Sequence, residues 1–515
     1  MRLSADRKKN GGPRRGGPPP DAAPAGSNRN RGVIPGRRTP EDRPGCGPWH
    51  SLKRRIGNGV YSIGVYSVPL TLILALALAA PGVARSQEAP GDTLRPTAAA
   101  GDTLNLTVAQ AVQLALVANE EARIARAAVD RTEGQVREAY ARVMPTIDGS
   151  YRFTRNLQRP VLFFDQDGET QQIEIGNAQE HAFDLTLEQP VIDFSLGSAL
   201  AAAGHGTAAS EASYERALTD VALDARLSYY SVLLADADVT VADNALELAQ
   251  RRLEQVQLFF DVGTAAEFDV LTARVALEGA RPDQIRAVNA QRLAYNELKR
   301  VTGVPFSTGV GLADSLSFQP VEIALDAAVT TALERRGDLI AQRETVALTR
   351  ELVEVQRSEA YPSVSLFLNL NRRASSEEIW PEDRNFTQSA TAALALDIPI
   401  FDGRRNQGLT LQARADYVTA VERLHALERD VELQVLDAWQ SVQAAAEGVT
   451  ATQATLELAQ RAYDIATVRF RSGLSTQLEL DEAEQDLIEA QSNAAEALYS
   501  HMAARALLLH AMGEI

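Results

Sequence analysis

The hydrophobic positions between residues 245 and 271 follow a helical repeat, and the same repeat recurs 210 residues later. In the first copy the apolar residues are Leu246, Ala249, Leu253, Val256 and Phe260. In the second copy the matching residues are Leu456, Ala459, Tyr463, Ala466 and Phe470. Alternating steps of three and four residues form a continuous apolar seam along a helix, which packs against a neighbouring helix in coiled-coil geometry. Both copies therefore predict antiparallel helix pairs, with turns at Gly263 and Gly473.

The helices before these turns are predicted to be very long. No proline interrupts the pattern from about residue 200 to 260, or from about residue 407 to 470. About sixty helical residues span about 90 Å, which suits a tube or a rod better than a compact domain. A glycine in the left-handed conformation ends a helix at low cost, so Gly263 and Gly473 mark the tips of the hairpins. Phe268 and Leu478 are expected to pack in the first turn of the returning helices.

Four shorter segments show the two-residue alternation of β-strands. Ile147, Tyr151 and Phe153 alternate with polar residues in the first segment, and Phe183, Leu185 and Leu187 do so in the second. The last two segments contain the apolar sets Val364, Leu366, Leu368, Leu370 and Leu394, Leu396, Ile398. Such strands suit a boundary between lipid and water, and roughly 9–11 residues cross a bilayer. Amphipathic hairpins on a soluble core are the alternative, but their equivalent positions between long helices favour the membrane.

After its N-terminal region, the chain consists of two sequence repeats of one structural unit. Pro145 matches Pro362 at an offset of 217 residues, Pro190 matches Pro399 at 209, and Gly303 matches Gly513 at 210. The eight-residue change lies between the two prolines, where a loop is expected. Each unit indicates helix, strand, strand, long helix and helix. The predicted first repeat is 104–304 (β-hairpin at about 146–192, tip at 263), and the second is 322–513 (β-hairpin at about 363–400, tip at 473), joined by a linker at 305–321.

The N-terminal region predicts export. Residues 1–58 form a basic Gly- and Pro-rich leader, either disordered or placed upstream of the true start. Residues 59–86 resemble a signal peptide, with an apolar run from Val68 to Ala80 and cleavage before Gln87. An uncleaved anchor is the alternative reading of that run. Residues 87–103 are a linker.

Charge and composition exclude several functions. Residues 1–86 contain 15 of the 51 Lys and Arg and 4 of the 68 Asp and Glu, which leaves a net charge of −28 in the remainder. That balance argues against nucleic acid as a partner. The single cysteine, Cys46, lies in the leader, so the exported part has neither disulfide nor thiolate metal site. No metal-binding histidine pair or phosphate-binding loop occurs, and we expect no cofactor and no enzymatic activity.

At this point the chain resembles the TolC-type outer membrane efflux proteins, or outer membrane factors. The resemblance runs from about Leu104 to Gly513 and rests on three phrases: "LTVAQAVQLAL" (from Leu106), "LDIPIFDGRR" (from Leu396) and "VRFRSGLSTQLELDEAE" (from Val468). It implies a mainly α fold with a membrane β-barrel, in which a homotrimer completes a twelve-stranded barrel in outer-membrane lipid. It further implies a periplasmic α-helical barrel below, which docks to a periplasmic adaptor (membrane fusion protein) linked to an inner-membrane transporter.

The resemblance also assigns functional residues. The adaptor-docking tips correspond to Val262, Gly263 and Thr264, and to Ser472, Gly473 and Leu474. The pore constriction corresponds to Glu479 and Glu482, with Asp481 next to them. The matching positions in the first repeat are Asp269 and Thr272. Three copies of such carboxylates would favour cations. The alternative is that acids near a helix N-terminus merely complement its dipole.

The competing function is an exported coiled-coil scaffold, or a periplasmic adaptor without a pore. Apolar faces at equivalent places on both hairpins favour the channel, because a scaffold has no need of them.

Overall fold

The computed structural model describes residues 104–166, 169–379 and 386–514. The chain divides into two units, Met1–Pro90 and Gly91–Ile515, and all described residues belong to the second. The predicted leader, signal peptide and first linker lie outside the described residues.

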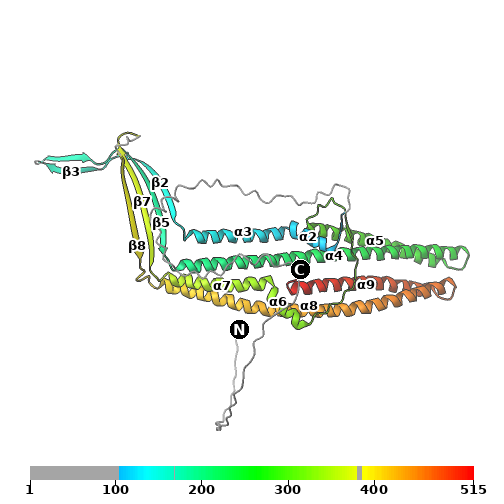
Figure 1. The fold of residues 1–515 in the computed structure, drawn as a ribbon. Helices are drawn as coiled ribbons and strands as arrows, with labels where there is room; N and C mark the ends of the chain where they lie inside the picture. Colours follow the sequence, from blue (N-terminus) through cyan, green and yellow to red (C-terminus); the bar gives the residue numbers. More distant parts are fainter. Residues whose placement is uncertain (1–103, 167–168, 380–385, 515) are drawn as a thin grey trace, which may run out of the picture. The chain divides into compact units, whose positions relative to one another are not determined.

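The order of elements is duplicated, as the sequence predicts (Figure 1). The first repeat contains α2 (Val108–Ala118), α3 (Glu120–Ala141), β2 (Thr146–Arg155), β5 (Gln179–Ile192), α4 (Ser195–Asp261) and α5 (Glu267–Thr302). The second contains α6 (Leu325–Arg335), α7 (Gly337–Ser358), β7 (Ser363–Ser376), β8 (Phe386–Asp397), α8 (Arg405–Arg471) and α9 (Gln477–Ala511). Helices α4 and α8 each have 67 residues, which confirms the long uninterrupted helices.

Strands from both repeats form one antiparallel sheet in the order β2-β5-β7-β8. Its register gathers the alternating apolar residues on one face. Leu187 lies between Ile147 and Leu368, and all three side chains therefore share that face. On the opposite face Thr186 lies between Asp148 and Asn369, and the Asn369 amide donates to Thr186 Oγ1 at 2.9 Å. The sheet thus has one apolar and one polar side.

The segment between β2 and β5 is longer than its counterpart and contains a second small hairpin. Strands β3 (Val161–Gln166) and β4 (Glu169–Glu174) pair with each other, where the sequence analysis expected only a loop. Arg159 pairs at the base of this hairpin with Glu174 at 2.6 Å and with Glu377, beyond the end of β7, at 2.8 Å. The longer segment of the first repeat therefore contains a pair of strands in addition to those of the main sheet.

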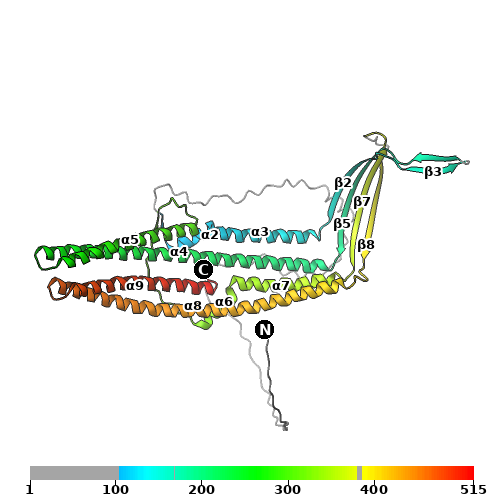
Figure 2. The same cartoon turned by 180° about the vertical axis from the view of Figure 1, so that it is seen from behind.

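The first helix of each repeat is broken in two at equivalent residues, Asn119 and Arg336. In the first repeat, Asn119 Nδ2 donates to the Val301 carbonyl near the end of α5 at 3.3 Å. In the second, Arg336 Nη1 donates to the Ala511 carbonyl at the end of α9 at 3.4 Å. The donors are 217 residues apart and the acceptors 210, so both repeats stack the end of the returning helix on this break by the same contact (Figure 2). We call these two contacts the helix joints.

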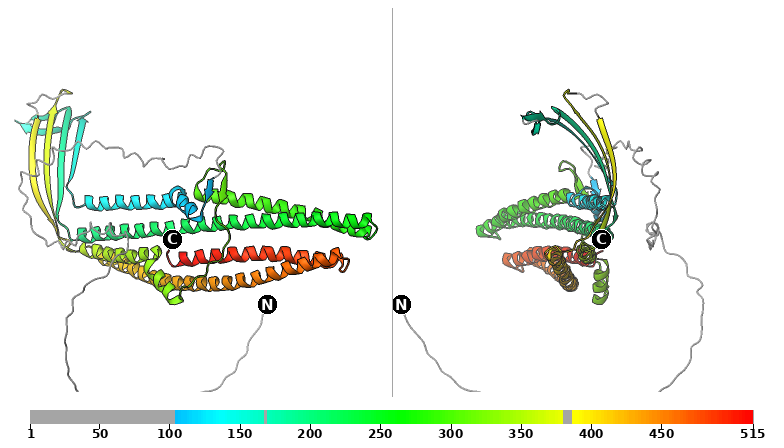
Figure 3. Two further views of the ribbon diagram at one scale, coloured as in Figure 1. Left: turned by 45° about the vertical axis from the view of Figure 1, so that its right-hand side comes forward. Right: turned by 90° about the vertical axis from the view of Figure 1, so that its left-hand side faces the viewer.

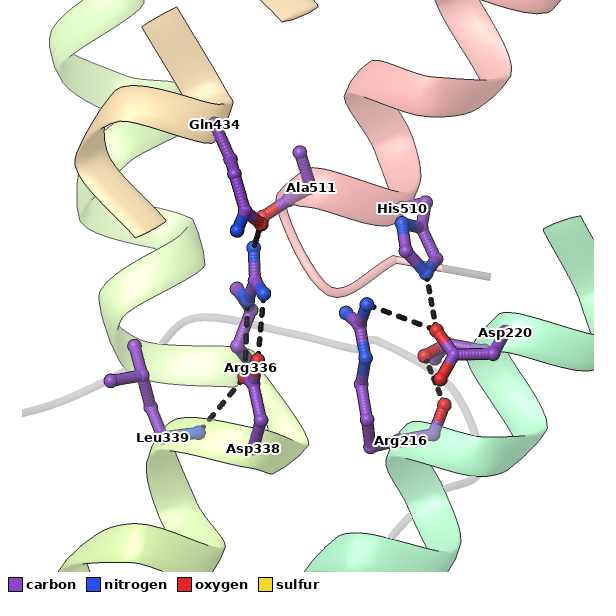
Figure 4. A network of polar contacts seen from close by, with 9 residues as sticks. Arg216, Asp220, Arg336, Asp338, Leu339, Gln434, His510 and Ala511 are labelled. Carbon is purple, nitrogen blue, oxygen red and sulfur yellow. Dashed lines mark hydrogen bonds and ion pairs between the residues drawn. The ribbon is translucent and has the colours of Figure 1, made fainter. Parts of the chain in front are cut away.

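The second helix joint is strongly polar (Figure 4). Arg336 is 2% exposed, and it pairs with Asp338 at 2.6 Å and donates to Gln434 at 2.8 Å. Burial opposes ionisation of Asp338, but the hydrogen bond and charge of Arg336 outweigh it and lower the pKa of that carboxyl. Nearby, Asp220 of α4 accepts from Arg216 at 2.9 Å and lies 2.6 Å from His510 of α9, tying both helices to this joint.

The linker between the repeats packs beside the first helix joint. Strand β6 (Val310–Leu312) pairs in parallel with β1 (Leu104–Leu106). The fully buried Tyr229 of α4 donates through its hydroxyl to the Leu106 carbonyl at 2.8 Å and lies 2.9 Å from Asp314 Oδ2. The linker is therefore held to the middle of α4.

Among the described residues, no helix is both long enough and apolar enough to span a membrane.

Candidate functional site

The two hairpin turns have the same backbone hydrogen bonds at equivalent positions. At the first turn, Gly263 N donates to the Phe260 carbonyl at 2.9 Å and Thr264 N to the Phe259 carbonyl at 2.8 Å. At the second, Gly473 N donates to Phe470 at 3.0 Å and Leu474 N to Arg469 at 2.8 Å. This pair of bonds defines a Schellman motif, which needs a left-handed residue. The glycines provide it, with φ of 79° and 68°.

The two hairpin turns are at the same end of the helices (Figure 3), and the last helical turns before them are in contact. The rings of Phe259 and Phe470, one from each turn, have centroids 5.9 Å apart. Below them, Val256 and Val270 form a small buried cluster against which Phe470 packs. The two helix pairs thus meet just behind their turns, and we call the six turn residues at this end the tip surface: Val262, Gly263, Thr264, Ser472, Gly473 and Leu474.

The tip surface is exposed and partly apolar. Val262 is 66% exposed and Leu474 is 71% exposed. The expectation that Phe268 and Leu478 pack in the first helical turn is wrong, because they are 75% and 64% exposed. The apolar seam begins two residues later, at Val270 and Leu480, and earlier side chains in the first turn point outwards. Phe268 and Leu478 thus enlarge the exposed apolar area beside the tips.

The four predicted acids have four different environments. Asp269 caps its own helix, since its Oδ2 accepts from Ala266 N at 2.9 Å. At the second tip the cap comes from Thr476, the equivalent of Ala266, whose Oγ1 accepts from Glu479 N at 3.3 Å. The Glu479 carboxylate is therefore spared for a contact with Arg469 at 3.7 Å. Glu482, one turn further along α9, is exposed and has no partner within the described ranges.

Asp481 faces the helix pair rather than solvent, and it reveals a cluster that the sequence analysis missed. Arg252 of α4 is 7% exposed and pairs with Asp481 at 2.5 Å and with the buried Glu484. One guanidinium thus faces two carboxylates. Burial raises the pKa of both Asp481 and Glu484, although the charge of Arg252 opposes the rise. No sequence signal identifies this pairing, because Arg252 and Glu484 are 232 residues apart.

The described part of the chain contains no group of three or more His, Cys, Asp or Glu side chains placed to hold a metal ion. The acids near the tips are suited to long-range electrostatics, and their geometry provides no ligand cage.

Known proteins with this arrangement are outer-membrane channels. Residues 111–304 and 328–514 match the family model "Outer membrane efflux protein". The outer membrane protein TolC of Escherichia coli is 22% identical over 416 residues, covering 78% of this chain and 81% of TolC. The CmeC outer membrane channel of Campylobacter jejuni has a similar fold, with a TM-score of 0.66 at 20% identity over 79% of this chain and 85% of CmeC. CusC has a TM-score of 0.67 at 20% identity, covering 80% and 94% of the two chains.

The family match includes most of both repeats and both hairpin turns, and it leaves out mainly the N-terminal region and the linker. A coiled-coil scaffold or an adaptor without a pore is thereby set aside. The chain belongs to the outer membrane efflux protein family.

Proposed function

We propose that three copies of this chain form the outer-membrane exit channel of a tripartite efflux or secretion system. In this assembly the sheet crosses the outer membrane, the helices extend into the periplasm, and the tip surface docks to a periplasmic adaptor that is linked to an inner-membrane transporter. The channel is passive, and energy for transport comes from the inner-membrane partner.

The observation that best supports the proposal is the incomplete two-faced sheet. Within the described ranges, β2 and β8 each pair on one side only, so the sheet has two free edges. Large apolar side chains on these edges are exposed, among them Tyr151 at 61% and Leu394 at 69%. Closing three such sheets into a ring of twelve strands would pair every edge, with the apolar face towards lipid and the polar face towards a water-filled pore.

The tip surface supports docking to another protein. Exposed apolar residues gathered around two identical turns are typical of interaction sites, whereas isolated exposed residues need no explanation. Val262 and Leu474 are such residues, and Phe268 and Leu478 extend the area.

The exposed acids of the second tip suit the pore entrance. Glu479 and Glu482 lie three residues apart on α9, and three copies would provide six carboxylates around the axis. We assign selectivity for cations to this pair. We assign Asp269 to capping of α5 and Asp481 to the ion-pair cluster with Arg252. Both residues would then affect the entrance by positioning the helices around it.

Native mass spectrometry of the detergent-extracted protein, followed by conductance in planar bilayers, tests the proposal. We expect a trimer and a pore that prefers cations. Glu479→Gln with Glu482→Gln should reduce that preference, while the control Glu457→Gln, on the exposed face of α8, should leave it unchanged. A monomer that forms no pore would refute the channel, and unaltered selectivity would remove the two acids from the entrance.

A further inference from the structure

A pocket of about 510 Å³ lies where the linker between the repeats crosses α4 and α9. Tyr229 and Tyr230 of α4 line it on one side, and His501 and Arg505 of α9 line it on another. Linker residues between 313 and 319 supply the remaining wall. The pocket is thus bounded by both repeats and by the segment that joins them, and its volume is in the range of sites that hold small organic molecules.

The linker wall of this pocket is held by hydrogen bonds at both ends. At one end Asp314 accepts from the Val108 backbone N–H at 2.8 Å and lies 2.9 Å from the Tyr229 hydroxyl. At the other end His501 Nε2 lies 2.9 Å from the Gln319 carbonyl oxygen and donates to it, because a carbonyl oxygen can only accept. A wall that is already ordered loses little conformational freedom when a ligand binds, which favours affinity.

Two arginines of the pocket have no carboxylate partner in the described part of the chain. Arg226 is half-buried and makes neither a hydrogen bond nor an ion pair with any described residue. Arg505 donates to the side chain of Gln319, which is a neutral amide. Asp314 is the acid among the described lining residues, and its Oδ2 atom already has two partners. The lining therefore keeps an excess of positive charge in a chain that is otherwise strongly acidic.

The two guanidinium groups both lie near the hydroxyl of Tyr230. Burial raises the pKa of that hydroxyl, and the positive charges of Arg226 and Arg505 both oppose the rise. Arg226 belongs to α4 and Arg505 to α9, so the two cations come from different repeats. Like charges in one partly buried pocket repel each other, and an anion between them would replace that repulsion by two attractive contacts.

The pocket also offers apolar surface and a buried ring nitrogen without a partner. Val108, Met502 and Leu509 supply the apolar surface. His501 is fully buried, and its Nδ1 atom has no hydrogen-bond partner among the described residues. Because buried polar atoms are nearly always hydrogen-bonded in folded proteins, an exception in a pocket wall favours a binding role over simple packing.

We propose that this pocket binds a small organic anion, with its carboxylate or phosphate group between Arg226 and Arg505 and its apolar part against Met502 and Leu509. The planar fork of a guanidinium matches two oxygen atoms of either acidic group. Such a ligand would contact α4, α9 and the linker at once, so its binding would hold the two repeats together. The site is formed by the single chain and is independent of the proposed channel.

Calorimetric titration of the full-length protein in detergent micelles tests the site. The anionic probes are benzoate and phenyl phosphate, which carry the two kinds of acidic group on the same aromatic ring. Benzamide is the matched neutral probe, because it has the shape of benzoate without its charge. Titration of each probe into micelles alone measures its partitioning into detergent, which is the same for every variant.

The informative variant is Arg226→Gln, since Arg226 makes no contact with a described residue that the substitution would break. Arg505→Gln removes the second cation. The matched control is Arg251→Gln, because Arg251 is an exposed arginine of the same helix α4. We expect an anionic probe to bind once per chain and to bind about tenfold or more weakly in each pocket variant, with no change in Arg251→Gln.

The thermal midpoint of each variant without probe shows that it is folded. Tighter binding of benzoate would assign a carboxylate ligand to the pocket, and tighter binding of phenyl phosphate would assign a phosphate ligand. Benzamide binding as tightly as benzoate would overturn the proposal, and so would an equal loss of affinity in Arg251→Gln. Failure of both anionic probes to bind the unmodified protein at millimolar concentration would overturn it as well.

Discussion

At the scale of single residues, Arg252 holds α4 to α9 close to the tip surface. It is buried and is the counter-ion of both Asp481 and Glu484. A buried ion pair contributes little compared with an apolar replacement of both partners, but removing one partner leaves an uncompensated charge. The packing of α4 against α9 near the tip surface therefore depends on this one guanidinium.

Arg252→Met should weaken the contact between α4 and α9 by about 3–5 kcal/mol, because two buried carboxylates would lose their counter-ion. Hydrogen exchange of the first turns of α9 would measure the local opening. The neighbouring Arg251→Met is the matched control, since Arg251 is exposed and pairs with the exposed Glu247 of its own helix. Its effect should stay below about 0.5 kcal/mol. Equal protection in both variants would contradict the role of Arg252.

The same cluster should make this region sensitive to pH. The pKa of Glu484 is raised in the folded protein, so the folded state binds a proton more readily than the unfolded state. The stability contribution of this group therefore falls as pH rises from its ordinary value through the raised one. Glu484→Gln should flatten this fall and raise the thermal midpoint at neutral pH.

Thermal unfolding between about pH 4 and 8 is the measurement. Glu482→Gln, on the exposed side of the same helix, is the control and should change the profile little. A steeper loss of stability with rising pH in Glu484→Gln would reverse the sign and refute the argument.

At the scale of elements, glycines at helix ends differ in what surrounds them. Gly303 and Gly473 have nearly the same φ, 67° and 68°. A Cβ on Gly473 would meet nothing within 4 Å, whereas a Cβ on Gly303 would lie 2.5 Å from the Ala118 Cβ. Gly303 is therefore required both by its backbone conformation and by close packing at the first helix joint. Gly473 is required by its backbone conformation alone.

Replacing each glycine by alanine should separate the two requirements. Gly473→Ala should cost about 1–2 kcal/mol for the left-handed conformation. Gly303→Ala should cost about 1–3 kcal/mol more, because α2 or α5 must move. Thermal unfolding of the two variants side by side would measure the difference. Equal midpoints would mean that α2 or α5 moves to accept the added methyl group without loss of stability.

The sequence predicts the elements well where a periodic pattern continues for many residues. Heptad spacing predicts α4 and α8, and alternation predicts the four strands, because both follow from which side chains must be buried. Asn119 is a residue type that favours the start of a helix, and its Oδ1 accepts from Glu121 N at 2.8 Å, but no periodic pattern marks the break there. The break at Arg336 has no such local signal, since Arg336 makes no side-chain cap and instead donates to a carbonyl of a distant helix. Pairing of Arg252 with Glu484 also depends on packing between elements. The resemblance assigned Asp481 and Glu482 together, and the structure turns them to different sides of α9.

At the scale of the whole molecule, the proposed assembly would give the sheet a lipid-facing and a pore-facing side. Leu368 lies near the middle of β7 on the apolar face, and its row includes Leu187 and Ile147. Thr391 lies on the neighbouring strand opposite Asn369, on the polar face. Position in the sheet, and not hydrophobicity alone, should decide which of these sites tolerates a charge.

Leu368→Arg should destabilise membrane insertion by about 2–4 kcal/mol if the residue contacts lipid near mid-bilayer. Thr391→Arg should insert normally and lower the conductance of the pore for cations. The amount of each protein in purified outer membranes, followed by conductance of the inserted fraction, would measure both effects. Normal insertion of Leu368→Arg would contradict lipid contact at this face.

The helix joints indicate that the two repeats can be made as separate polypeptides. Each returning helix stacks on a helix of its own repeat, through Asn119 in one repeat and Arg336 in the other. Each half is thus closed by contacts of its own, and residues 305–321 are the covalent tether between the halves. The protein should therefore tolerate being made as two polypeptides cut within that tether, which reassemble in the cell. Halves with different mutations could then be mixed to build channels that differ at alternate positions around the ring.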